Sequence, residues 1–358
     1  MHKYDHSIST GRNHNITFQG RNLMNNRTSK FRIASVASLA LTALILTGCT
    51  ATSPATTAPA AGGAKDNKVI GVSVADQKSL FYVAAVSGMK QAAEAAGYKL
   101  VVLSADNDSG KQVNQVQDLI TQQVGALIFT AQDATSAAAG VKLANEAKIP
   151  VVAVDQKPES GNGVLATYIA TDSVKAADKL CTWLFEKLGG KGDIAILQGP
   201  LGATAELQRS QGCNDALKKY PGIKVVGKES AGWDETKAFT ASQNILTANP
   251  NLKAVFAESD AMALGAAKAA KQAGRTGMFF IGIDGFPTML DAISSGLTQA
   301  TQAQQPYLMG QLAVANAISI LTGKGDSVPK LQYQDTVLVT KDNVADNDAT
   351  KFYGPSTK

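Results

Sequence analysis

Short, β-branched apolar runs alternate with longer, alanine-rich stretches from residue 69 onward. Each short run predicts a buried strand, and each longer stretch, whose apolar residues recur at helical spacing, predicts a helix. In the first series the predicted strands are 69–75, 99–105, 126–131 and 150–155, and the predicted helices are 81–97, 110–123 and 134–147. Strands that are apolar throughout and separated by helices form parallel sheets covered on both faces.

The same rhythm starts again after Asp172 and Ser173, a pair typical of a helix N-terminus. The second series predicts strands at 193–199, 223–230, 253–259, 278–285 and 297–304, and helices at 174–188, 204–219, 235–247, 261–273 and 286–295. A body of about 300 residues exceeds the size at which one core stops growing. The pattern therefore predicts an α/β protein with two doubly wound parallel-sheet lobes.

A leader with different character precedes this body. Residues 33–47 are almost wholly apolar and follow Arg27, Lys30 and Arg32, as in an export signal. This run is shorter than the roughly 20 apolar residues that a transmembrane helix needs. Residues 1–23 fit no export signal, so either Met24 is the true start or the basic region before the apolar run is unusually long.

The segment Leu46-Thr47-Gly48-Cys49 resembles the bacterial lipobox, a leucine and two small residues before a cysteine. In bacterial lipoproteins that cysteine takes a diacylglycerol on its sulfur before the leader is cut. The following tract, 50–64, has no charge and almost no large apolar residue, which predicts a flexible tether. We therefore expect export and lipid anchoring through Cys49 to the outer face of the bacterial cell membrane, or a periplasmic location. An ordinary export signal with a chance cysteine is the alternative.

The net charge and the histidine content of residues 49–358 limit the classes of function to consider. The leader holds 6 of the 34 Lys and Arg residues and 1 of the 29 Asp and Glu residues, so 28 of each remain and the net charge is 0. The basic character of the whole chain therefore gives no argument for a nucleic-acid partner. All three histidines also lie in the leader, which removes the commonest general base and metal ligand from the body. We expect no enzyme activity, no cofactor and no metal.

Two cysteines remain besides Cys49. Cys181 and Cys213 both fall on predicted helices and would lie outside the cytoplasm, where a disulfide can persist. The sequence leaves two alternatives open, a disulfide and a pair of buried free thiols.

Polar side chains collect where the predicted strands end, which is where open α/β sheets bind ligands. Carboxylates and amides hydrogen-bond to vicinal hydroxyls, aromatic rings cover the C–H faces of a sugar, and a guanidinium binds two oxygens at once. These residue types therefore predict a pocket for a small, uncharged, hydroxyl-rich molecule. The alternatives are helix capping for the two aspartates, core packing for the aromatic pair that opens the first helix, packing between the lobes for Trp233, and a solvated strand end for Gln304. Asp260 is interpreted as a helix cap and is left out. The predicted ligand-binding residues are Phe81, Tyr82, Asp155, Gln156, Arg209, Trp233, Ser259, Asp284 and Gln304.

Residues 69–340 resemble the periplasmic sugar-binding proteins of ABC transporters, specifically the ribose-binding-protein-like group. The stretches that carry the resemblance include VQDLITQQVGALIF, LQGPLGATAELQRSQG, ILTANPNLKAVFAESDAMALGA and FFIGIDGFP. The family's binding residues match this sequence at Phe81, Tyr82, Asp155, Arg209, Trp233, Asp284 and Gln304. The family's arginine is replaced by Gln156 and its asparagine by Ser259. Because these changes remove side-chain N–H groups that donate hydrogen bonds to ligand hydroxyls, we expect a sugar other than ribose, or a linear or cyclic polyol.

The resemblance implies the type I periplasmic binding protein fold, with a three-segment hinge that closes around the ligand and a closed form that docks on a membrane permease. The expected organisation is a leader at 1–48, a lipidated linker at 49–67, a first lobe at 68–171 plus 305–332, a second lobe at 172–304 plus 333–345, and a tail at 346–358. We expect a monomer. A sensory protein that presents the same ligands to a chemoreceptor or sensor kinase shares all these residues and stays open as the alternative.

Overall fold

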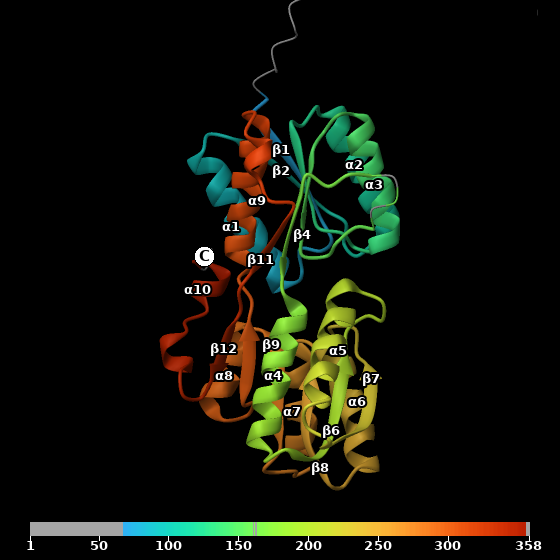
Figure 1. Cartoon of the computed structure of the whole chain (residues 1–358), viewed down its shortest axis with the longest axis vertical. Coiled ribbons are helices and arrows are strands. Elements are labelled where there is room, and N and C mark those ends of the chain that lie inside the picture. Colours follow the sequence, from blue (N-terminus) through green and yellow to red (C-terminus); the bar gives the residue numbers. More distant parts are fainter. Residues whose placement is uncertain (1–66, 160, 162, 356–358) are drawn as a thin grey trace, which may run out of the picture. The chain divides into compact units, whose positions relative to one another are not determined.

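The computed structural model describes residues 67–159, 161 and 163–355. The leader, Cys49 and nearly all of the expected linker lie outside these residues. The first of two sheets has the strand order β11-β5-β4-β3-β1-β2, and all its neighbouring strands pair in parallel (Figure 1). Its strands are β1 (Val69–Val74), β2 (Lys99–Ser104), β3 (Ala126–Phe129), β4 (Val151–Val154), β5 (Thr167–Thr171) and β11 (Leu331–Gln334).

The second sheet repeats this arrangement with the order β12-β10-β9-β8-β6-β7. Only β12 is antiparallel to its neighbour among the pairs described. Its strands are β6 (Lys191–Gln198), β7 (Gly222–Ser230), β8 (Leu252–Ala257), β9 (Phe279–Asp284), β10 (Ala300–Ala303) and β12 (Val337–Thr340). Strands β1 to β5 thus correspond in position to β6 to β10, and the prediction of two doubly wound α/β lobes is confirmed.

Helices follow most of the strands. The first lobe contains α1 (Leu80–Ala95), α2 (Ser109–Thr121), α3 (Ala134–Glu146) and α9 (Pro306–Leu321). The second lobe contains α4 (Ser173–Lys187), α5 (Thr204–Leu217), α6 (Glu235–Ala248), α7 (Asp260–Gln272) and α8 (Pro287–Ser295). Two 3₁₀ turns, Gly325–Ser327 and Val344–Asp346, and the short α10 (Thr350–Tyr353) complete the elements of the described residues.

The sequence pattern had given no prediction for β5 or α9. Strand β5 is short and carries a threonine at each end, so it lacks the apolar run of its neighbours. Helix α9 packs against α1 on one side and β3, β4 and β5 on another, which explains its apolar character on several faces (Figure 1). Both elements complete the core of the first lobe, where Met309, Ala313 and Val314 are fully buried.

The chain passes between the sheets three times, after β5, after β10 and between β11 and β12. Strand β11 belongs to the first sheet and ends at Gln334, so the third passage lies at 335–336. The first two passages are joined directly, because Thr171 Oγ1 donates a hydrogen bond of 2.6 Å to Gln304 Oε1. Both side chains are buried.

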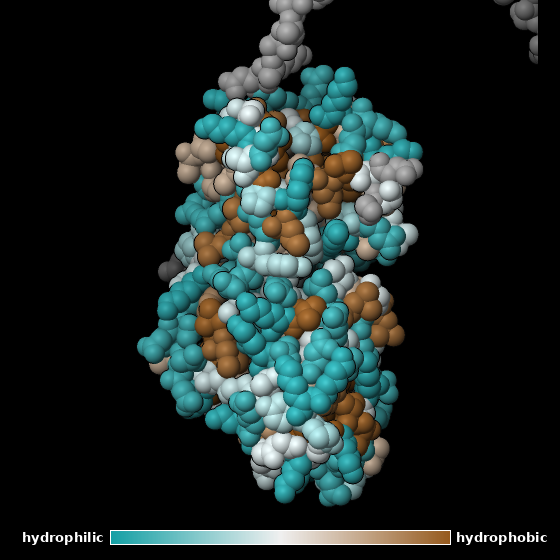
Figure 2. Space-filling model, viewed as in Figure 1, coloured by the Kyte–Doolittle hydropathy of each residue, from teal (hydrophilic) through white to brown (hydrophobic). Residues whose placement is uncertain are grey.

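Among the residues described, none of the helices combines the length and the apolar composition needed to cross a bilayer. Figure 2 shows polar side chains over most of one face, with apolar residues in separate small groups. The large apolar side chains that are exposed include Leu80 and Val83 on the first lobe and Leu201 and Leu207 on the second.

Candidate functional site

Asp284 is the centre of the site in the second lobe. It is the last residue of β9 and is buried, with 6% of its surface exposed. Gln304 Nε2 donates to Asp284 Oδ1 at 2.8 Å, and Arg209 Nη1 lies 3.7 Å from the same oxygen. Burial raises the pKa of Asp284, and the nearby Arg209 charge and the Gln304 hydrogen bond work against this rise.

Arg209 comes from the second turn of α5 and reaches the same point. Its Nη1 donates to the carbonyl oxygen of Glu258, and its guanidinium carbon lies 5.3 Å from the centre of the Trp233 ring. This cation–π contact and the ion pair with Asp284 fix the guanidinium in place. Among the described residues, Arg209 Nε is buried without a hydrogen-bond acceptor. A buried donor of this kind is an available contact for a bound oxygen.

Asp155 is the corresponding residue of the first lobe, since it follows β4 as Asp284 ends β9. Its carboxylate accepts a hydrogen bond of 2.8 Å from Tyr82 Oη, and its carbonyl oxygen accepts one of 2.6 Å from Tyr168 Oη. Burial raises the pKa of Asp155, while the Tyr82 hydrogen bond and the charge of Arg209 lower it. Because Arg209 belongs to the other lobe, its field reaches across the space between the two carboxylates.

Three of the predicted ligand residues have backbone angles that side chains rarely adopt. The φ angle is 63° at Asp155, 66° at Trp233 and 152° at Asp284. Strained backbone of this kind persists only where surrounding contacts hold it and is concentrated at functional sites. The other non-glycine residues with positive φ in the described part lie in exposed turns: Asp106, Asn107, Gln123 and Lys148.

The remaining predicted residues differ in how they meet the site. Phe81 is 7% exposed and packs in the core of the first lobe, edge-on to Tyr82. Ser259 Oγ accepts from Met262 N at 3.4 Å and caps α7. Gln156 is half-buried beside Asp155. The structure therefore brings Tyr82 and Asp155 together in one lobe, and joins Asp284 to Arg209 and Gln304 in the other.

The interpretation of Asp260 as a helix cap was wrong. Ser259 occupies the cap position, and the Asp260 carboxylate points away to the turn after β9. It accepts hydrogen bonds from the backbone N–H groups of Gly285 at 2.6 Å and Phe286 at 2.9 Å, and from Thr301 Oγ1 at 2.7 Å. Burial and the neighbouring Asp284 raise the pKa of Asp260. This side chain fixes the turn that carries Asp284.

Sequence reasoning also missed a buried polar cluster behind Arg209. Glu258 accepts from Gly199 N at 2.9 Å and from Ser210 Oγ at 2.7 Å, while Glu206 accepts from Gln198 Nε2 at 2.6 Å and from Gly202 N at 3.0 Å. Burial raises the pKa of Glu258 to about 7 despite its hydrogen bonds and Arg209. The cluster connects the loop after β6 to the end of β8.

Cys181 on α4 and Cys213 on α5 form a disulfide in the structure, with their Cα atoms 5.4 Å apart. The bridge lies in the core between α4 and α5, away from the strand ends. It therefore holds the outer layer of the second lobe and does not line the site.

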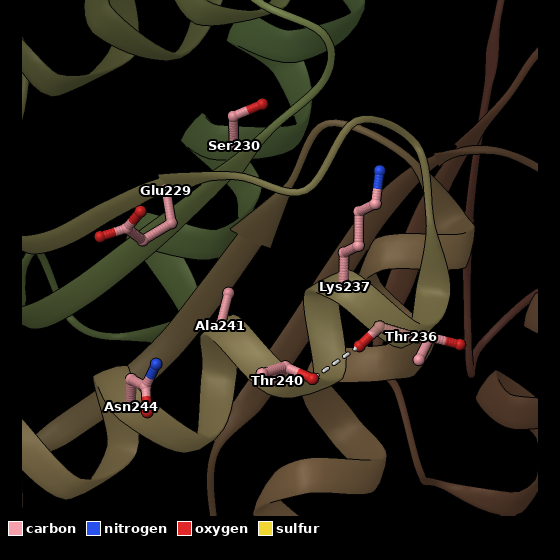
Figure 3. Close-up of a pocket in the computed structure, with 7 residues that line it drawn as sticks. All are labelled: Glu229, Ser230, Thr236, Lys237, Thr240, Ala241 and Asn244. Atoms are coloured by element: carbon pink, nitrogen blue, oxygen red, sulfur yellow. Dashed lines mark hydrogen bonds between the residues drawn. The ribbon is translucent and has the colours of Figure 1, made fainter. Parts of the chain in front are cut away.

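Another depression lies on the second lobe, between the end of β7 and the first turns of α6. It has a volume of about 440 Å³ and is lined by Glu229, Ser230, Thr236, Lys237, Thr240, Ala241 and Asn244 (Figure 3). None of these is a predicted ligand residue, and Figure 3 shows the side chains spread along an open groove. Within the described part of the chain, no group of three or more His, Cys, Asp or Glu side chains is arranged to hold a metal ion.

Asp155 and Asp284 lie at equivalent strand ends of two α/β lobes, and the charge of Arg209 acts on both carboxylates. This arrangement is typical of a solute-binding protein. Residues 70–325 match the family model described as periplasmic binding protein domain. The chain belongs to the periplasmic binding protein family. The resemblance to ribose-binding-protein-like members, predicted above, is confirmed, and the family implies an extracytoplasmic location.

Relatives of this periplasmic binding protein bind sugars and a polyol. It is 36% identical over 286 residues to the ribose import binding protein of Bacillus subtilis, covering 80% of this chain and 92% of the relative. It is 38% identical over 322 residues to the xylitol-binding protein of Mycolicibacterium smegmatis, covering 89% and 88%. Its structure is similar to the fructose-binding periplasmic domain of a hybrid two-component system, with a TM-score of 0.72, 30% identity, and coverage of 77% and 92%. The chain is thus a binding protein rather than an enzyme.

Proposed function

We propose that this protein is the lipid-anchored solute-binding component of an ABC importer, and that it captures a small neutral sugar or polyol between its lobes. The observation that carries the proposal is that Asp155 and Asp284 lie at equivalent strand ends of the two sheets and that the charge of Arg209 acts on both carboxylates. Each carboxylate accepts hydrogen bonds from ligand hydroxyls, and Arg209 Nε donates one.

The charges of the site favour an uncharged ligand. The site offers the two carboxyl groups of Asp155 and Asp284 but the single guanidinium of Arg209, and a phosphate or carboxylate group on the ligand would add negative charge beside these acids. The rings of Trp233 and Tyr82 supply apolar faces for C–H groups.

Within this class we propose a polyol before a ring sugar. Gln156 and Ser259 replace the family's arginine and asparagine, and Ser259 Oγ already caps α7. Trp233, where the family commonly has phenylalanine, lies against Gly199 so closely that a Cβ atom on Gly199 would meet its ring at 2.1 Å. The larger indole ring leaves less space for the ligand, and fewer hydrogen-bond donors remain for its hydroxyls. A small, flexible polyol fits such a site better than a ring sugar. The xylitol-binding relative supports this choice.

Capture occurs by hinge closure. The chain passes between the lobes three times, and Gln304 contacts both Asp284 and Thr171 at these passages. A ligand held by Asp155 and Asp284 contacts both lobes only in the closed form, so it shifts the equilibrium by its differential affinity for that form. The closed form then docks on the membrane permease, while lipid on Cys49 keeps the protein at the membrane.

A thermal-shift panel of pentoses, hexoses, linear polyols and cyclic polyols tests the ligand class. We expect at least one neutral polyhydroxylated compound to raise the Tm, because a ligand that binds only the folded state adds stability in proportion to RT ln(1 + [L]/Kd). Sugar phosphates serve as the charged control and should give no shift. If no neutral compound shifts the Tm, the proposed ligand class is wrong.

A second candidate is a sensory protein for the same ligands, which the similarity to the two-component periplasmic domain favours. Uptake of labelled ligand by a deletion strain separates the two. Loss of uptake supports the importer, whereas normal uptake with lost ligand-induced gene expression supports the sensor.

A further inference from the structure

The C-terminal segment Thr350–Gly354, here named the C-terminal strap, contacts both lobes. Phe352 is 3% exposed and packs in the second lobe against Leu290, Ala303 and Val339. Helix α10 also contacts α9 and α1 of the first lobe, and Figure 1 shows it beside the junction of the lobes.

The contact with the first lobe is close. Gly354 has a φ of 74° and lies so near Tyr307 of α9 that a Cβ atom would meet the ring at 2.2 Å. A glycine is needed there both for the backbone angle and for the absence of a side chain.

Tyr353 extends from the strap to the back of the ligand site. Its Oη donates to the carbonyl oxygen of Asp284 at 2.9 Å, and its ring lies 5.6 Å from that of Phe286. The backbone N–H of Gln304 donates to the same carbonyl at 2.9 Å. These two donors hold the peptide of a residue whose φ of 152° is unfavourable for a side chain.

The first lobe has an equivalent hydrogen bond from a tyrosine to a strand-end carbonyl. Tyr168 Oη donates to the carbonyl oxygen of Asp155, which occupies the equivalent strand end and also has a positive φ. In that lobe the tyrosine belongs to the neighbouring strand β5, whereas in the second lobe it comes from the far end of the chain. The same contact made by two unrelated segments indicates that the strand-end carbonyl has to be held.

We propose that Tyr353 is a positioning residue for the ligand-binding carboxylate of Asp284, and that the C-terminal strap couples this position to the hinge. The ligand part of the proposal rests on the proposed function. Because the strap touches α9 in one lobe and the end of β9 in the other, rotation of the lobes changes its contacts on at least one side. The strap therefore biases the hinge in the absence of ligand as well.

The first arm of the test measures xylitol affinity of the full-length protein by calorimetry. Tyr353→Phe keeps the ring beside Phe286 and removes only the hydroxyl, so we expect affinity to fall about fivefold, the weight of one typical net hydrogen bond. Tyr98→Phe is the matched control, because Tyr98 packs half-buried against the core of the first lobe, and its hydroxyl makes no hydrogen bond within the described part of the chain. Equal affinity of the parent and Tyr353→Phe overturns the positioning role.

The second arm needs no ligand. Spin labels at Lys90→Cys in α1 and Lys271→Cys in α7, both exposed, report the distance between the lobes by pulsed electron spin resonance, with Cys49→Ser in every sample. Gly354→Ala should shift or broaden the ligand-free distance distribution, and so should a chain ending at Ala349, which keeps the test valid if the first variant folds poorly. An unchanged distribution in both variants overturns the coupling. If xylitol binds neither to the parent nor to the variants, the distance measurement still tests whether the C-terminal strap is coupled to the hinge. In that case only the choice of xylitol as the ligand is wrong.

Discussion

The two lobes have the same strand order, yet they hold their equivalent aspartates by different means. Asp284 in the second lobe is paired with Arg209, receives a hydrogen bond from Gln304 and lies against a turn that Asp260 fixes. Asp155 in the first lobe has no cation from its own lobe among the contacts described and receives a tyrosine hydroxyl instead. The second lobe therefore holds both members of an ion pair, Arg209 and Asp284. The first lobe supplies the Asp155 carboxylate, and the cation that acts on it, Arg209, belongs to the other lobe.

The packing of the outer helices also differs between the two lobes. In the first lobe α1 and α9 approach closely at Gly88 and Gly310, where a Cβ atom would meet backbone oxygens of the opposite helix at 2.0 and 1.9 Å. In the second lobe Gly212 allows the corresponding approach of α5 to α4, and a disulfide is added. The lobe that holds the ion pair is thus also the covalently reinforced one.

The largest effect is expected from Asp284→Ala, which leaves Arg209 buried without its carboxylate. Ligand affinity should fall by about 2–5 kcal/mol, as it does when one partner of a buried charge pair is removed. Asp155→Ala should cost less, because it leaves only a tyrosine hydroxyl without its acceptor. Calorimetric titration of both variants checks this order, with circular dichroism as the folding control, and equal losses would contradict the difference between the lobes.

Replacing both disulfide cysteines by serine should destabilise the second lobe. A bridge that closes a loop of this length, with a sequence separation of 32, contributes about 2–4 kcal/mol to the free energy of unfolding. Hydrogen exchange should rise in α4 and α5 while α1 and α9 keep the protection of the parent. Uniform loss of protection in both lobes would show that the bridge stabilises the whole molecule instead.

Glu258→Gln should change the pH dependence of stability. The folded-state pKa of Glu258, about 7, lies above its ordinary value of 4.5, so the folded protein binds this proton more tightly than the unfolded chain. Binding of this proton adds to the free energy of unfolding in full below pH 4.5, and the added stability is lost as the pH rises towards 7. Because one pKa unit corresponds to about 1.4 kcal/mol, the stability lost is on the order of 3 kcal/mol.

Urea unfolding of the parent and of Glu258→Gln between pH 4 and 8 measures this dependence. The variant should lose less stability than the parent as the pH rises. Parallel curves would mean that Glu258 has the same pKa in the folded and the unfolded protein, which would contradict the raised pKa.

A smaller effect than that of Asp284→Ala is expected from Tyr82→Phe in the first lobe. Loss of one hydrogen bond to the Asp155 carboxylate should weaken ligand binding by about 1–2 kcal/mol, and the ring remains to cover the ligand. Titration of this variant beside Tyr98→Phe, a half-buried tyrosine packed against the core of the same lobe, isolates the contribution of the Tyr82 hydroxyl. A loss as large as that of Asp284→Ala would place the main binding energy in the first lobe.

Much of this arrangement could be predicted from the sequence because it follows strand ends. Asp155 and Asp284 come directly after apolar runs, and parallel strands bring their carboxyl ends to one edge. The hydroxyls of Tyr168 and Tyr353 could not be found in this way, since one lies in a strand that was not predicted and the other is 69 residues from its acceptor. Asp260 was misread for a similar reason: next to a serine before a helix it resembles a cap, and only the tertiary fold brings Gly285 to it.

The most direct test of the account is a crystal structure of the protein with the compound that gives the largest thermal shift. The account predicts an uncharged, polyhydroxylated molecule between the lobes, with hydroxyls on the carboxylates of Asp155 and Asp284 and an oxygen on Arg209. A ligand bound in the groove beside α6, or one that contacts a single lobe, would contradict it.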